Sequence, residues 1–345
     1  MASPQPVYPS GGETYLASPQ LGDTAERLPE IRNHGPEERL PEIRNREAAG
    51  FWLSRKCLIA TIVLLVVVIA AVAGGVGGAL AHRNRQRTGA CDPSTNDQLS
   101  TIPIPAWFYW GQTASQISSL LNKYNARLTQ IRIDDPSVPT FTVSMIQNTG
   151  AYQSGWWWYY GYTADALSPL LDGKRLISID PYFDASSNLR FAVVMVPNDG
   201  PQNRGWWWYY GIDSDTVNSL LQKNQARLIA LRAYNDHGVR HFAIIMISNT
   251  AQDFRNSEWY YGVSIQEISS RIDTGLRPIA ISPDPFGQWD TILVSWGGEN
   301  WSWYYGLSGQ AILDTMGKDM TRLVDVSNYI LNGALVFSVA ETENG

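Results

Sequence analysis

Cysteine is nearly absent from this chain of 345 residues, which contains 2 cysteines beside 14 tryptophans and 17 tyrosines. Two cysteines form at most one disulfide bond, so the composition excludes a disulfide-stabilised scaffold. Lysine and arginine are outnumbered by acidic residues, since the net charge is −6 and the isoelectric point about 5.3. Phosphate recognition depends on those two basic residues, so no nucleic-acid partner is expected.

Histidine is also scarce, and we predict neither a cofactor nor a metal site. His237 and His241 flank a predicted turn, but no cysteine and no further histidine is available to complete a metal site there. The sequence has no Ser-x-x-Lys pair, no Gly-x-Ser-x-Gly motif and no phosphate-binding glycine loop. Enzyme activity is therefore uncertain from the sequence, and a non-catalytic role is favoured.

The first 56 residues have few apolar side chains to offset chain entropy, and we predict a disordered cytosolic tail at 1–56. The tail contains the octapeptide ERLPEIRN twice, at Glu26–Asn33 and at Glu38–Asn45. This duplication is either a neutral expansion of an unconstrained segment or a repeated docking peptide for a cytosolic partner.

Residues 57–81 are an uncharged, apolar run, longer than the roughly 20 residues that cross a hydrocarbon core. A signal peptide is disfavoured, because the run is too long and lies too far from the N-terminus. We therefore predict one transmembrane helix at 57–81. Basic residues on its N-terminal side favour a cytosolic N-terminus, as in a type II signal-anchor protein. The C-terminal domain is then extracellular or lies in a secretory lumen.

Features around this predicted helix favour a homodimer. Ala70, Gly74 and Gly78 form a stripe of small residues that lets two helices approach closely. Cys91, in the predicted juxtamembrane linker at 82–104, has no cysteine after it and is a candidate for an intermolecular disulfide. Cys57 lies at the predicted cytosolic end of the helix and is a candidate for palmitoylation.

An aromatic run that ends in glycine recurs five times after residue 105, which predicts a tandem-repeat domain at 105–345. The runs end at Gly111, Gly161, Gly211, Gly262 and Gly306. The predicted repeats cover about 107–155, 156–205, 206–256, 257–300 and 301–345.

Each repeat shows the same order of local signals. Two residues after each glycine stands a helix N-cap residue, followed by apolar residues at helical spacing. The N-cap candidates are Thr113, Thr163, Asp213, Ser264 and Ser308. An arginine then begins a β-rich segment, and a turn leads to a second strand. The recurring arginines are Arg127, Arg175, Arg227, Arg277 and Arg322. We assign these arginines, like the five glycines, a structural role within the repeat.

The predicted fold is α+β, built from five strand–helix–strand–strand repeats that form a closed or superhelical domain. A β-propeller is the alternative, and it is disfavoured because propeller blades have four strands and no helix. A closed ring would make the first and fifth repeats neighbours, so that the first aromatic run completes the fifth repeat.

The repeat resembles the bacterial tandem repeat domain, through its Tyr/Trp–Gly marker, its short helix and its Arg-led strand, as in Gly275-Leu276-Arg277-Pro278. That repeat also forms the N-terminal half of fungal polyglycine hydrolases. The similarity covers about 105–345, and no part of this sequence resembles the hydrolase domain that carries catalysis in those enzymes. The resemblance therefore implies an accessory or binding domain without that enzyme.

Aromatic side chains on one face of each run are the candidate ligand contacts, since exposed aromatic surfaces mark binding sites. The candidates are Trp156, Trp158, Tyr160, Trp206, Trp208, Tyr210, Trp301 and Trp303. The alternative is that both faces of the run pack between repeats. Asn300 lies in the one Asn-x-Ser/Thr sequon of the predicted outer domain and is a candidate glycosylation site.

The leading functional hypothesis is a single-pass membrane protein that displays a tryptophan-rich repeat domain for binding a glycan or protein ligand. A hydrolase assembled on the repeats and a structural scaffold without a small ligand are the two alternatives. The outer portion, residues 90–345, has 24 acidic and 16 basic residues, which disfavours attraction to anionic surfaces.

Overall fold

The computed structural model describes residues 43–44, 100, 102–200, 203–272, 275–295 and 301–344. The predicted transmembrane segment 57–81, its small-residue stripe, Cys57, Cys91 and Asn300 lie outside these residues. Among the helices in the described ranges, none combines the length and the apolar character that a membrane crossing requires.

Five units with the order strand, helix, strand, strand follow one another along the chain, as the sequence predicts. The first contains β2 (Ala106–Thr113), α2 (Ala114–Tyr124), β3 (Ala126–Asp135) and β4 (Thr140–Gln147). The second contains β5 (Trp157–Tyr162), α3 (Ala164–Leu167), the 3₁₀ helix η3 (Ser168–Leu171), β6 (Lys174–Phe183) and β7 (Leu189–Pro197). The third contains β8 (Trp206–Ile212), α4 (Ser214–Asn224), β9 (Ala226–Asp236) and β10 (Val239–Ser248). The fourth contains β11 (Ser257–Val263), α5 (Ile265–Ile272), β12 (Leu276–Pro283) and β13 (Trp289–Ser295). The fifth contains β14 (Trp301–Leu307), α6 (Gly309–Asp319), β15 (Thr321–Leu331) and β16 (Ala334–Glu343).

Every repeat forms its own three-stranded antiparallel sheet, in which the second hairpin strand lies between the aromatic strand and the Arg-led strand, as in β2-β4-β3. A two-residue strand, β1 (Ile43–Arg44), adds to the second sheet by pairing with β5. Strands predominate over the short helices, so the domain is mostly β rather than an even α+β mixture. The strands of the described residues belong to separate sheets and do not form one closed barrel.

The marker glycine turns each aromatic strand into its helix. All five glycines have positive φ, between 61° and 76°, and the strand register shifts at each of them. Glycine adopts this conformation without steric cost, so it suits a bulge that bends a strand. Each predicted N-cap side chain then accepts a hydrogen bond from a backbone N–H of the first turn, as Asp213 does from Thr216 at 2.8 Å.

The second helix is shorter than the three turns that the apolar spacing predicts. It is α-helical only over Ala164–Leu167 and continues as the 3₁₀ helix η3, in which Pro169 stands near the start. Proline has no backbone N–H and cannot donate the hydrogen bond that would extend the α-helix.

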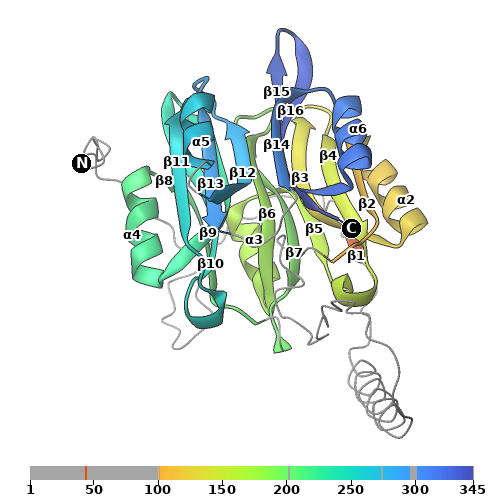
Figure 1. Ribbon diagram of the computed structural model, residues 1–345, viewed down its shortest axis with the longest axis horizontal. Helices are drawn as coiled ribbons and strands as arrows, with labels where there is room; N and C mark the ends of the chain where they lie inside the picture. Colours follow the sequence, from red (N-terminus) through yellow and green to blue (C-terminus); the bar gives the residue numbers. More distant parts are fainter. Residues whose placement is uncertain are drawn as a thin grey trace, which may run out of the picture. The chain divides into compact units, whose positions relative to one another are not determined.

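The repeats contact one another in chain order, and the fifth also contacts the first (Figure 1). The Arg-led strands of neighbouring repeats lie side by side, and β15 lies beside β3. Gln130 of β3 donates to the carbonyl oxygen of Val324 at 2.9 Å, and Phe108 lies in one apolar cluster with Ile312 and Phe337. The five repeats therefore close on themselves with propeller-like radial repetition, although each sheet has three strands and an added helix.

Candidate functional site

The aromatic strands supply the cores between repeats. Within each run, the ring three residues before the glycine stacks on the ring next to the glycine, at 5.4 to 5.9 Å between centroids. An aromatic side chain from the preceding repeat meets this pair edge-on, as Phe141 meets Trp158 and Tyr160. The equivalent rings at the other junctions are Phe191, Phe242, Trp289 and Phe337. Edge-on and offset-stacked rings are the favoured arrangements, so these contacts stabilise each junction.

The candidate ligand contacts occupy two kinds of position. Trp156, Trp158, Trp206 and Trp208 are buried in the junction cores. Tyr160, Tyr210, Trp301 and Trp303 are half-buried. The structure therefore does not gather these eight side chains into one surface, and their role in ligand contact stays a prediction.

The recurring arginines lie at the junctions near the start of each Arg-led strand. Arg127, Arg175, Arg227 and Arg322 are buried, and Arg127 donates to the carbonyl oxygen of Tyr152 at 3.2 Å. Burial lowers the pKa of Arg127 to about 10, helped by the positive charges of Arg322 and Arg175. Arg277 is the exception, because it is half-buried and covers the ring of Trp301 at 5.3 Å.

A buried polar cluster links four repeats where the Arg-led strands meet. Asp325 of the fifth repeat accepts from Arg132 of the first at 2.8 Å and from Arg232 of the third at 2.5 Å. Its second oxygen accepts from the backbone N–H of Ile281 in the fourth repeat at 3.3 Å. This cluster is absent from the sequence-based candidates, because Arg132 and Arg232 stand five residues after the recurring arginine of their repeats, whereas Asp325 stands three residues after Arg322.

Two further carboxyl groups have no ion pair among the interactions described: Asp290 is buried and Asp180 is half-buried. Asp180 accepts from the backbone N–H of Ile133 at 2.8 Å, and burial raises its pKa to about 8. Asp290 accepts from the backbone N–H of Gly262 at 3.0 Å, and burial raises its pKa to about 7. Its other oxygen is buried without a hydrogen-bond partner. Neither group lines the pocket described next, so both are treated as structural.

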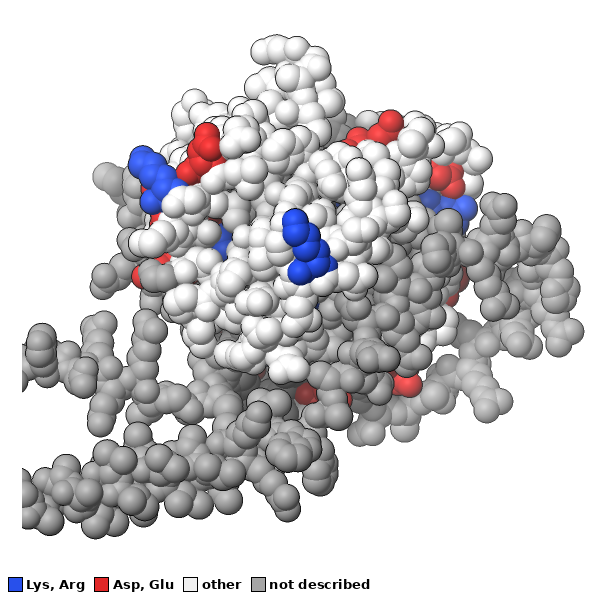
Figure 2. Space-filling model, turned by 90° about the vertical axis from the view of Figure 1, so that its right-hand side faces the viewer, with Lys and Arg blue, Asp and Glu red and all other residues white. Residues whose placement is uncertain are grey.

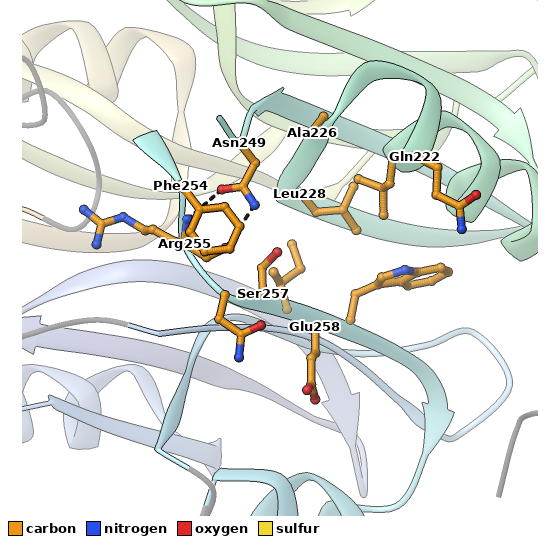
Figure 3. A pocket seen from close by; sticks show the side chains of 12 residues that line it. Gln222, Ala226, Leu228, Asn249, Phe254, Arg255, Ser257 and Glu258 are labelled. Carbon is orange, nitrogen blue, oxygen red and sulfur yellow. Dashed lines mark hydrogen bonds between the residues drawn. The ribbon is translucent and has the colours of Figure 1, made fainter. Parts of the chain in front are cut away.

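A pocket of about 300 Å³ lies at the junction of the third and fourth repeats. Leu221, Ala226 and Leu228 of the third repeat form one wall, and Ser257 and Trp259 on β11 form the other. Figure 3 shows the Ser257 side chain on the side of β11 that faces Leu228, while Glu258 points away from Leu228. Ligand pockets range over roughly 300–1,000 Å³, so this one suits a single ring system.

The residue type at position 257 explains why this junction is open. Counted back five positions from the marker glycine, the second and third repeats have Trp156 and Trp206, whereas the fourth has Ser257. At the first junction, Trp156 packs in one cluster with Leu121, Ala126 and Leu128, and Leu121 is only 3% exposed. The corresponding Leu221 and Ala226 at the third junction are half-exposed. A serine therefore leaves the space that an indole fills at two other junctions.

Polar and aromatic groups surround the mouth of the pocket. Asn249 bridges the loop before β11, because its side chain donates to the carbonyl oxygen of Arg255 and accepts from the Arg255 N–H (Figure 3). Phe254 precedes Arg255 and is 65% exposed, where the corresponding residues of the first two repeats are Gln153 and Asn203. Trp259 donates from Nε1 to Asn218 at 3.0 Å, which fixes one wall.

The residues that precede the common part of the aromatic run differ between the repeats, and this difference marks the pocket in the sequence. The second and third runs begin with Trp-Trp-Trp, and the fourth begins with Ser-Glu-Trp. The first run begins with Ala106, which lies half-buried beside the cluster of Ile104, Ile146 and Tyr152. The residue type at this position therefore has to be read together with the burial of its neighbours to tell an open pocket from a filled junction.

Charged side chains are sparse and of both signs on the face of the domain that carries α2 and α6 (Figure 2). Within the described ranges, no group of three or more histidine, cysteine, aspartate or glutamate residues is arranged to hold a metal ion. The pocket at the third junction can enclose an apolar ring and offer hydrogen bonds at its mouth. A scan against models of known protein families and a search of curated proteins both find no match to this chain.

Proposed function

We propose that this chain is a non-catalytic binding protein whose repeat domain holds its ligand in the pocket at the junction of the third and fourth repeats. One observation carries the proposal: this junction has an open pocket where two equivalent junctions are filled by tryptophan. The walls are apolar and come from packed strands and a capped helix, so the pocket is preformed. The resemblance to the bacterial tandem repeat domain supports a binding or accessory role.

The proposal includes display of this domain on the outer side of a membrane by the predicted helix at 57–81. The apolar length of that segment and the basic residues before it support the arrangement. Homodimer formation through this helix and Cys91 belongs to the same proposal. Glycosylation of Asn300 and palmitoylation of Cys57 are further proposals that depend on this orientation.

The binding role is tested with the full-length chain in detergent, applied to glycan and peptide arrays. We expect a retained ligand, and we expect Ser257→Trp to reduce its binding at least tenfold by filling the pocket. Ser119→Trp is the matched control, because Ser119 lies on the exposed face of α2 in the first repeat. Equal retention by the wild type and the Ser257 variant would place the ligand elsewhere and overturn the pocket assignment.

The orientation is tested by adding protease outside intact cells. We expect the protease to remove the repeat domain and to spare the N-terminal tail. If residues 57–81 span a membrane, Ile43 and β5 lie on opposite sides of it. One molecule therefore cannot have both this topology and the β1–β5 pair. Loss of the tail with protection of the repeats would contradict the type II orientation.

A further inference from the structure

We infer that the pocket at the third junction is an indole-sized socket that takes an aromatic ring from the ligand. The inference rests on the proposed binding function and names the chemical class of the group that enters the pocket. It excludes a sugar ring as the occupant, although a glycan is one of the ligand classes that the aromatic composition suggests.

The first and second junctions hold an indole where the third junction has a serine. Trp156 at the first junction is 2% exposed, and Trp206 at the second is 8% exposed. Each indole lies in one apolar cluster with the last leucine of the preceding repeat's helix and with the leucine that follows the recurring arginine, Leu121 and Leu128 in the first case. The third junction retains both leucines, as Leu221 and Leu228, and has Ser257 in place of the indole. These walls are therefore already shaped for an indole.

The inner walls of the pocket are apolar and aromatic. Leu221, Ala226, Leu228 and Ile292 present apolar atoms, and Trp259 adds an aromatic ring held by Asn218. A hexose carries hydroxyl groups around its whole edge, and hydroxyl groups buried against such walls would lose their hydrogen bonds to water. An aromatic ring has no such groups to desolvate and gains stacked or edge-on contacts with Trp259.

Hydrogen-bond acceptors lie at the mouth of the pocket. Gln222 and Asn256 line the pocket and are exposed, whereas the Glu258 carboxylate accepts from the Tyr260 hydroxyl at 2.5 Å. An indole or phenol that enters ring-first would leave its N–H or O–H near these acceptors. The arrangement thus favours an aromatic ring with one donor over an aliphatic side chain.

The test follows 5-fluoroindole by ¹⁹F NMR in the presence of the full-length protein. We expect saturable line broadening with one site per chain and a dissociation constant in the micromolar to millimolar range. Methyl β-glucoside serves as the sugar probe and should not compete at the same concentrations. Competition by the sugar would overturn the inference. So would a ¹⁹F resonance of 5-fluoroindole that does not broaden at millimolar protein in excess over the probe.

Two variants link the signal to the pocket. Ser257→Trp should reduce 5-fluoroindole binding at least tenfold, whereas the matched Ser119→Trp should leave it unchanged. If Ser257→Trp fails to fold, Ser257→Leu fills part of the same space and should weaken binding severalfold. Unchanged binding by a folded Ser257 variant would overturn the inference.

The reciprocal variant opens a second socket. Trp206→Ser should destabilise the second junction, and added indole should raise its melting temperature more than that of the wild type, with two sites per chain. A lack of such rescue would contradict the claim that these junctions are equivalent sockets. Array ligands that bind through Ser257 without any 5-fluoroindole binding would overturn the aromatic class and leave the proposed binding function standing.

Discussion

Asp290 shows how a single residue sets one repeat apart. It occupies the strand position at which the other repeats have small side chains, and all five side chains are buried. The equivalent residues are Thr142, Ala192, Ala243 and Ser338. The carboxyl group accepts the N–H of Gly262, a bond that Tyr234 and Tyr329 provide through their hydroxyl oxygens in the third and fifth repeats.

The buried carboxyl group of Asp290 should make stability depend on pH. Burial raises its pKa to about 7, well above its value in an unfolded chain, so the folded state binds the proton more tightly. Stability is therefore lost as the pH rises from about 4 to about 7. Asp290→Asn keeps an acceptor for Gly262 and removes the titrating group. We expect the change that it causes in the free energy of unfolding to be more stabilising at pH 8 than at pH 5 by about 3 kcal/mol.

Denaturant unfolding at the two pH values measures this difference. Asp172→Asn, at an exposed turn, is the matched control and should give a much smaller change between pH 5 and pH 8. An Asp290→Asn effect of the same size at both pH values would contradict a carboxyl group that titrates near neutrality.

At the scale of the element, the N-cap of the helix recurs in all five repeats, although the helices differ in length. Thr113 and Ser264 form reciprocal capping boxes with Gln116 and Glu267, whereas the Asp213 side chain accepts from Thr216. Each cap satisfies a backbone N–H that has no partner within its helix. The cap of α4 also matters for the proposed site, because the C-terminal end of α4 supplies Leu221 and Gln222 to the pocket.

Removal of the α4 cap should weaken the third repeat. We expect Asp213→Ala to lower the free energy of unfolding by about 1 kcal/mol, because the N–H of Thr216 loses its acceptor. Asp215→Ala, in the first turn but not at the cap, should cost only a few tenths of that. Thermal unfolding of both variants gives the comparison, and equal losses would show that the Asp213 cap has no special role.

At the scale of the whole molecule, Asp325 connects distant parts of the sequence. Arg132 precedes it by 193 residues and Arg232 by 93, and both donate to the same carboxyl oxygen. All three side chains are at most 6% exposed. One carboxylate thus links the first, third, fourth and fifth repeats and helps to hold the fifth repeat against the first.

Loss of this carboxylate should destabilise the whole domain. Asp325→Ala leaves two arginines buried without their shared anion, and we expect a loss of about 3–5 kcal/mol in the free energy of unfolding. Arg190→Ala removes the half-exposed pair with Asp184 and should cost about 1 kcal/mol or less. A cost for Asp325→Ala as small as that of the surface pair would contradict its linking role.

Local features of the fold could be predicted from the sequence. The marker glycines, the N-caps and the two-residue turn at Asn332–Gly333 depend on backbone conformations that few residue types favour, so their identities are informative. The short second helix was missed because Pro169 stands within an otherwise regular apolar pattern. Position 257 was missed because the pattern marks what a repeat shares, whereas a pocket arises where one repeat differs.

By itself the sequence determined the repeat: its order of elements, its caps and its aromatic marker, because these depend on residues close together in the chain. Only the tertiary structure decided that the fifth repeat meets the first, that Asp325 joins two distant arginines, and that four of the proposed ligand-binding tryptophans are buried. These features depend on packing between residues that are far apart in the sequence. A tryptophan at one position of the repeat is part of the core at one junction, and where serine replaces it the missing volume becomes a pocket.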